Sequence, residues 1–163
     1  MKRFATMSAV ALLAALPATS QAQTTSTDEA AIAFERAEIL TEQAYMAAGQ
    51  QQDFETAATW LRDAASLRGD DAATFRLLLD AGHFHVYAER SLKAASAFNA
   101  AAQIALEFGD RAGAALAYRN AAFAADRAGD AIAARALMAQ SQQLAVEATV
   151  AQAEVAFGQT MSR

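Results

Sequence analysis

The sequence predicts an all-α protein, and two observations carry most of that prediction. Ala accounts for 48 of the 163 residues and Pro occurs once; Ala is the best helix former, whereas Pro breaks helices. Glycines also recur at regular intervals, since Gly49, Gly69, Gly109 and Gly129 are separated by 20, 40 and 20 residues. No segment shows the sustained alternation of apolar and polar residues that a half-buried strand requires. We therefore expect helices and no sheet.

Most of these glycines are followed by Asp, as in Gly69-Asp70, Gly109-Asp110 and Gly129-Asp130. Gly suits the left-handed residue just past a helix end, and Asp suits the N-cap of the next helix. Each pair therefore indicates that one helix stops and another starts, and Glu89 stands where the series lacks its glycine. The expected helices span residues 28–48, 53–68, 71–88, 91–108, 111–128 and 131–157.

The short links between these segments predict antiparallel neighbours, and hence three helical hairpins. The second helix of each hairpin carries a small, a large and a small residue at positions i, i+4 and i+7. These residues are Ala57, Leu61 and Ala64; Ala94, Phe98 and Ala101; and Ala134, Met138 and Ser141. All three positions lie on one helix face, where small residues let a neighbouring helix approach and the large one fills the gap.

The first 22 residues have the layout of a secretory signal peptide. Lys2 and Arg3 are followed by an apolar run over residues 4–16, by Pro17 and by the small-residue site Ser20-Gln21-Ala22. The run is 13 residues long, which is shorter than the roughly 20 needed to cross a bilayer. We expect cleavage after Ala22 and a periplasmic location for the mature protein.

Cleavage would leave residues 23–163, which fit one domain. It would also move the net charge from −5 to −7, because it removes two basic groups and no acidic ones. We expect residues 23–27 to form a loose N-terminus, residues 28–158 the helical domain, and residues 159–163 a C-terminal tail. No later apolar run approaches membrane length, so we expect no stable membrane insertion after cleavage.

The composition excludes several kinds of site. The chain has no Cys, and therefore no disulfide, thiolate metal site or cysteine nucleophile. The net negative charge argues against a nucleic-acid partner. His83 and His85 lie two positions apart, so on a helix they point to opposite sides and cannot easily share a metal. No phosphate loop or nucleophile elbow occurs, and no paired carboxylates are evident. We expect no catalytic residues, no metal and no cofactor.

The sequence resembles tetratricopeptide (TPR) or TPR-like helical repeat proteins over about residues 38–148. The middle unit matches the spacing of the family's signature positions with Leu78, Ala81, Gly82, His85, Ala94, Phe98 and Ala101. The last unit follows with Tyr118, Ala121, Ala122, Gly129, Ala134, Met138 and Ser141, and the first with Tyr45, Ala57, Leu61 and Ala64. The repeat differs from the family in its length of 37–40 residues instead of 34 and in lacking the helix-ending Pro.

The resemblance implies a right-handed α-solenoid of about three antiparallel hairpins, whose first helices build a concave face. Such proteins usually bind peptides or partner proteins there. The implied partner-binding residues are Arg76, Leu79, His83, Tyr87, Arg119, Phe123 and Arg127. Ile39, Glu42, Met46, Val86, Leu116 and Asp126 would lie on the same face. Arg and aromatic residues dominate the energetics of many interfaces, although Arg119 and Arg127 also fit a plain solvated surface.

The leading functional hypothesis is a non-catalytic periplasmic interaction or scaffold module that binds a polypeptide. One alternative is a carrier of an apolar small molecule, with Leu79, Phe84, Phe123 and Met138 lining an enclosed pocket. A second alternative is a self-assembling helical protein, a homo-oligomer in which residues 131–157 pack against their own copy.

Overall fold

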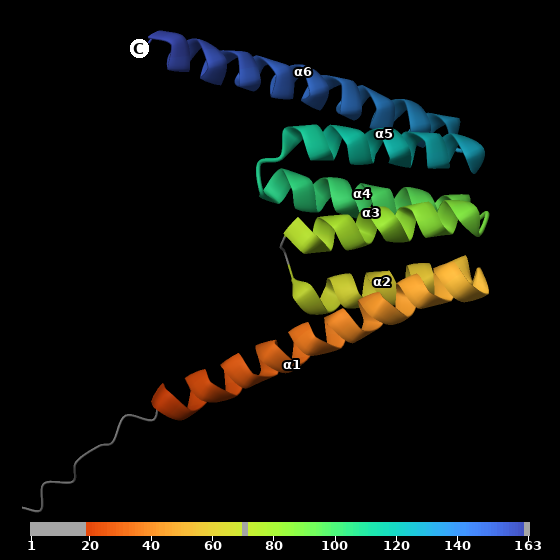
Figure 1. Ribbon diagram of the computed structural model, residues 1–163. Coiled ribbons are helices and arrows are strands. Elements are labelled where there is room, and N and C mark those ends of the chain that lie inside the picture. Colours follow the sequence, from red (N-terminus) through yellow and green to blue (C-terminus); the bar gives the residue numbers. More distant parts are fainter. Residues whose placement is uncertain (1–18, 70–71, 162–163) are drawn as a thin grey trace, which may run out of the picture.

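The computed structural model describes residues 19–69 and 72–161 (Figure 1). The part of the chain within these ranges is almost wholly helical and contains no strand, which confirms the all-α prediction. The elements are α1 (Thr19–Met46), a π-helical turn η1 (Ala47–Gln51), α2 (Phe54–Arg68), α3 (Ala72–Tyr87), α4 (Ser91–Glu107), α5 (Arg111–Arg127) and α6 (Ala131–Met161).

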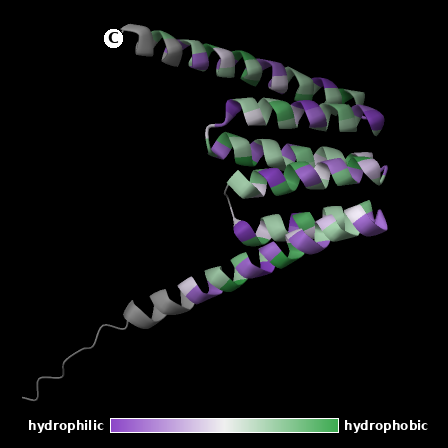
Figure 2. Ribbon diagram, viewed as in Figure 1, coloured by the Kyte–Doolittle hydropathy of each residue, from purple (hydrophilic) through white to green (hydrophobic). Residues whose placement is uncertain are grey.

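The helices form a stack in which each one packs mainly on its neighbours in sequence. α1 lies at one end of the stack and α6 at the other, and both project beyond the four shorter helices on the same side of the molecule (Figure 1). Hydrophilic and hydrophobic residues alternate along the helices (Figure 2), as expected for elements with one buried face.

Three of the connections have one geometry. Glu89, Gly109 and Gly129 are left-handed, with φ angles of 58°, 74° and 84°. The N–H of the next residue reaches back to a carbonyl five positions earlier, from Arg90 to His85, from Asp110 to Ala105 and from Asp130 to Ala125. The carboxylates of Asp110 and Asp130 then accept from the backbone N–H groups of Gly113 and Ala133. Both Gly-Asp pairs therefore end one helix and cap the next as predicted, whereas Asp70 lies outside the described residues.

Two helices are longer than expected. α1 begins at Thr19 instead of residue 28, so residues 23–27, expected to be loose, are helical. α6 continues to Met161, which makes part of the expected 159–163 tail helical. Neither extension contains a Pro, and helix propagation costs little once a packed segment has formed. The expected signal peptide falls mostly on residues 1–18, which lie outside the described part.

The core is built chiefly from Ala, and its largest fully buried side chains are Phe98, Leu61 and His85. The small-large-small pattern is buried as expected in α2 and α4. In α6, Ala134 and Met138 are half-buried, while Ser141 is buried and its hydroxyl donates to the Ala115 carbonyl of α5 at 2.7 Å. Small residues therefore set the close spacing of the helices.

Candidate partner-binding surface and grooves

Four predicted site residues lie on α3. Arg76, His83 and Tyr87 are exposed, whereas Leu79 is half-buried and packs against the core. The Tyr87 ring is 65% exposed although it lies 5.3 Å from the Phe54 ring of α2. The His83 ring contacts Phe98 of α4, with ring centroids 5.1 Å apart. α3 therefore presents two aromatic rings that are supported from behind and accessible in front.

Arg76, the one Arg or Lys of α3, lies one helical turn before a residue that contacts α1. The Tyr45 hydroxyl donates to the Asp80 carboxylate, one helical turn after Arg76. Partial burial and this hydrogen bond raise the pKa of Tyr45 to about 12. Arg76 forms no ion pair within the described part of the chain. Its guanidinium is available to a ligand.

The other three predicted residues, Arg119, Phe123 and Arg127, are exposed on α5, and each lines a different groove. Phe123 faces Met138 of α6 across a groove of about 550 Å³ that also contains Asp126. Arg119 lies with Leu116 in a second groove of about 340 Å³ between the same two helices.

Arg127 lies in a third groove, which is built by the α3–α4 connection. This groove has a volume of about 470 Å³ and is also lined by Arg90, Leu92 and Lys93. The four α3 residues line none of these three grooves, so the structure does not bring the seven predicted residues into one cavity.

The pocket expected for a small-molecule carrier does not form as predicted. Phe123 and Met138 do face one groove, but Leu79 and Phe84 pack against the buried core cluster instead. Two aromatic neighbours, Tyr45 and Phe54, lie about 6 Å from the Phe84 ring, with centroid distances of 6.1 and 6.0 Å. Phe84 is therefore held between α1, α2 and α3 and does not face the α5–α6 groove.

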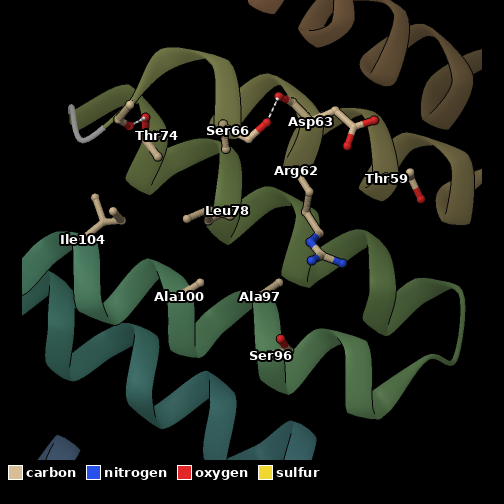
Figure 3. Close-up of a pocket in the computed structure, with 12 residues that line it drawn as sticks. Thr59, Arg62, Asp63, Ser66, Thr74, Leu78, Ser96, Ala97, Ala100 and Ile104 are labelled. Carbon is tan, nitrogen blue, oxygen red and sulfur yellow. Dashed lines mark hydrogen bonds between the residues drawn. The ribbon is translucent and has the colours of Figure 1, made fainter.

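Sequence reasoning did not identify a polar groove of about 480 Å³ between α2 and α4. Arg62 extends from α2 toward α4 in this groove (Figure 3). Leu78, Ala97, Ala100 and Ile104 supply apolar lining, and Thr59, Ser66 and Ser96 supply hydroxyls. The sequence carried one signal for this groove, which is the helical spacing of three polar residues along one side of α2: Thr59, Arg62 and Ser66. Their juxtaposition with Ser96 depends on tertiary packing.

An ion-pair cluster joins α2 to the start of α4. Glu55 accepts from Arg90 and from Lys93, at distances of 2.9 and 2.8 Å. Hydrogen bonds from Arg90 and then from Lys93 lower the pKa of Glu55 to about 2. His85 is buried, and burial lowers its pKa.

The remaining observations concern metals, membranes and relatives. The described residues contain no group of three or more His, Asp or Glu side chains placed to hold a metal ion. None of the helices in the described ranges combines the length and the apolar character needed to span a bilayer. Comparison of the chain with protein families, with curated proteins and with solved structures finds no match.

Proposed function

We propose that the chain is a TPR-like α-solenoid that acts in the periplasm as a non-catalytic interaction module, and that it binds a helical segment of a partner protein along α5. One observation carries this proposal: an exposed aromatic ring and an unpaired cation border grooves on one helix. Phe123 is 58% exposed, and Arg119 forms no ion pair within the described residues. Rings and guanidinium groups of this kind are typical interface anchors.

The packing of α5 itself indicates what kind of segment would fit. α5 packs on α4 through a buried cluster in which Ala121 and Ala124 meet Ala94 and Phe98. The α6 residues aligned with Ala94 and Phe98 are Ala134 and Met138, and both line the groove beside Phe123. The α5–α6 grooves therefore correspond to the surface of α4 that α5 covers. Because a helix covers that surface of α4, we expect the partner to place a helix in the α5–α6 grooves.

Charge defines the partner helix further. Leu79 and Val86 of α3 pack against the cluster that includes α5, and the residues 40 positions later are Arg119 and Asp126. Both charged residues line the grooves. The partner segment should therefore be an amphipathic helix with small apolar residues, an acidic group opposite Arg119 and a basic group opposite Asp126.

Site-specific photo-cross-linking in intact cells tests this function. A photoreactive phenylalanine analogue in place of Phe123 should give one defined protein adduct, and adding Arg119→Glu should remove it. The same analogue in place of Ile32, an exposed residue of α1 that lines none of these grooves, serves as the control. No adduct from position 123, or the same adducts from both positions, would refute the proposal.

The double variant Arg119→Ala with Phe123→Ala gives a second test, on the purified adduct partner. Loss of interface anchors should weaken binding by about 2 kcal/mol or more, which is roughly thirtyfold in affinity. The free energy of unfolding should change by no more than about 0.5 kcal/mol per residue, because both side chains are exposed. A large loss of stability would show that Phe123 belongs to the core.

A further inference from the structure

α6 has a second apolar side, which faces away from the rest of the molecule. Leu137 and Ser141 face α5, since Leu137 packs against a cluster that includes α5 residues and Ser141 donates to Ala115. The opposite side forms what we call the outer seam: Ile132, Ala136, Ala139, Gln143, Val146, Val150 and Ala153. Every residue of the seam is exposed, with Ile132, Val146 and Val150 at 78%, 64% and 51%.

The spacing of the outer seam is that of a coiled coil. Its residues are separated alternately by four and three positions from Ile132 to Ala153. Apolar residues that repeat every 3.5 positions keep one seam pointed at a neighbouring helix. Three such heptads extend over about 30 Å of helix at 1.5 Å per residue. The partner of this side is therefore another helix.

Two positions of the seam are polar in the other second helices. Ala136 and Ala139 align with Ser96 and Asn99 of α4 and with Thr59 and Arg62 of α2. All of these polar residues are exposed. At these two positions α2 and α4 present polar groups to water, whereas α6 presents Ala. An exposed apolar strip of this length marks an interaction site.

The seam is complementary to itself. When two copies of α6 run antiparallel about a twofold axis at Gln143, Ala136 meets Val150, and Ala139 meets Val146. Each small residue then lies beside a larger apolar one, which fills the space between closely packed helices. A parallel arrangement would put Ala against Ala and Val against Val.

Gln143 is the one polar residue of the seam, and it also fits a twofold axis. Its amide donates to Glu147 at 3.0 Å, and Glu147 is held by Arg111 of α5 at 3.2 Å. This leaves the amide oxygen and the second N–H of Gln143 for its own copy, since an amide both donates and accepts. α6 contains only three charged residues, Arg135, Glu147 and Glu154, and none lies on the seam.

We propose that two copies of the chain associate through their outer seams, as an antiparallel pair of α6 helices with the twofold axis at Gln143. This interface is separate from the α5–α6 grooves, because no seam residue lines them. Partner binding and self-association can therefore fail independently.

Sedimentation equilibrium of the purified chain tests the association. The wild-type chain should sediment with twice the mass of one chain, and Val150→Glu should halve that mass. Ala151→Glu adds the same charge at the next position, which is exposed but off the seam, and should leave the dimer intact. Circular dichroism should show equal helix content in all three proteins. A monomeric wild type, or equal effects of both variants, would overturn the proposal.

Disulfide formation tests the axis, and the chain has no Cys to interfere. Gln143→Cys should give a disulfide-linked dimer under mild oxidation. Gln142→Cys, which is also exposed but about 100° around the helix, should remain largely unlinked. Equal linkage of the two variants, or failure of Gln143→Cys to link, would exclude a twofold axis at Gln143.

Discussion

At the scale of single residues, α3 can approach α4 closely because Gly82 has no side chain. Gly82 is buried in the middle of α3, and a Cβ added there would overlap the ring of Phe98. Phe98 is itself among the largest fully buried residues. Gly82 has helical backbone geometry, so its value lies in the space it leaves and not in conformational freedom. The ring of Phe98 occupies that space.

Gly82→Ala should therefore destabilise the protein by about 1–3 kcal/mol, as overpacking of a core does. Gly49→Ala is the matched control, because a Cβ at Gly49 meets nothing within 4 Å. It should be neutral or stabilising by up to about 1 kcal/mol, since Ala favours a helix more than Gly does. Urea denaturation of both variants measures the difference. If Gly82→Ala were also neutral, the close contact with Phe98 would be wrong.

His85 is buried without a polar partner. Its side chain is 1% exposed, and neither ring nitrogen has a hydrogen-bond partner in the described structure. Burial lowers the pKa of His85 below its ordinary 6.5, and the positive charges of Lys93 and Arg62 lower it further, against a smaller opposing effect of Glu55. The unfolded chain therefore takes up a proton at this ring more readily than the folded chain does.

This difference predicts the pH dependence of stability. The contribution of His85 to the free energy of unfolding is fully present above the pKa of this ring in the unfolded chain, near 6.5. It declines as the pH falls below that value, because protonation favours the unfolded state. Urea denaturation at pH 7.5 and pH 5.5 should show this loss for the wild type. His85→Phe removes the titrating group and should flatten the dependence, whereas His83→Phe should not. An unchanged slope in His85→Phe would show that other groups are responsible.

At the scale of the helices, the connection at Glu89 is the exception among three similar turns. Glu89 adopts the left-handed conformation that Gly109 and Gly129 adopt at the two following turns. A side chain in this conformation costs roughly 1–2 kcal/mol, whereas Gly adopts it without strain. α4 also begins without a side-chain cap, because its N-cap is Arg90. Of the three helices that follow α3, α4 therefore has the least favourable start.

Glu89→Gly should therefore stabilise the protein by up to about 1 kcal/mol. Gly109→Ala, which forces a side chain into the same conformation, should destabilise it by a similar amount. Thermal denaturation followed by circular dichroism measures both changes. Stabilisation by Gly109→Ala would contradict the shared turn geometry.

These helices show what sequence reasoning can and cannot provide. Helix ends were predictable where the chain carries its own signal, as at Gly109-Asp110, and even Glu89 was identifiable as the gap in the series. The start of α1 was not, because residues 23–27 carry no stop signal and their polar character alone suggested a loop. The exposure of Tyr87 and Phe123 was expected from the resemblance to TPR repeats. The groove around Arg62 was not, because it requires two helices 37 residues apart in sequence to meet.

At the scale of the whole molecule, export would remove a part of α1 that precedes the first buried residue described. The expected cleavage after Ala22 falls within the first turn of α1, which begins at Thr19. The first fully buried residue described is Ala37, several turns later. Removal of residues 1–22 should therefore leave the packed stack unchanged.

Intact-mass measurement of the protein from the periplasmic fraction should give a chain that starts at Gln23. Its thermal denaturation midpoint should equal that of the full-length chain made without export, because the mature chain keeps every buried residue described. A full-length chain found only in the cytosol would refute the signal-peptide prediction.

The arrangement of the helices in order has a consequence for how the molecule assembles. Because each helix packs chiefly on its neighbours in sequence, no long loop has to close before a stabilising contact forms, and local contacts favour fast folding. Opening should begin at the outer ends, where a helix has one neighbour, and progress inward. Backbone amides of α1 and α6 should exchange with solvent first, and those of α3 and α4 last. A dimer joined through α6 would reverse this order at one end, protecting the helix that would otherwise open early.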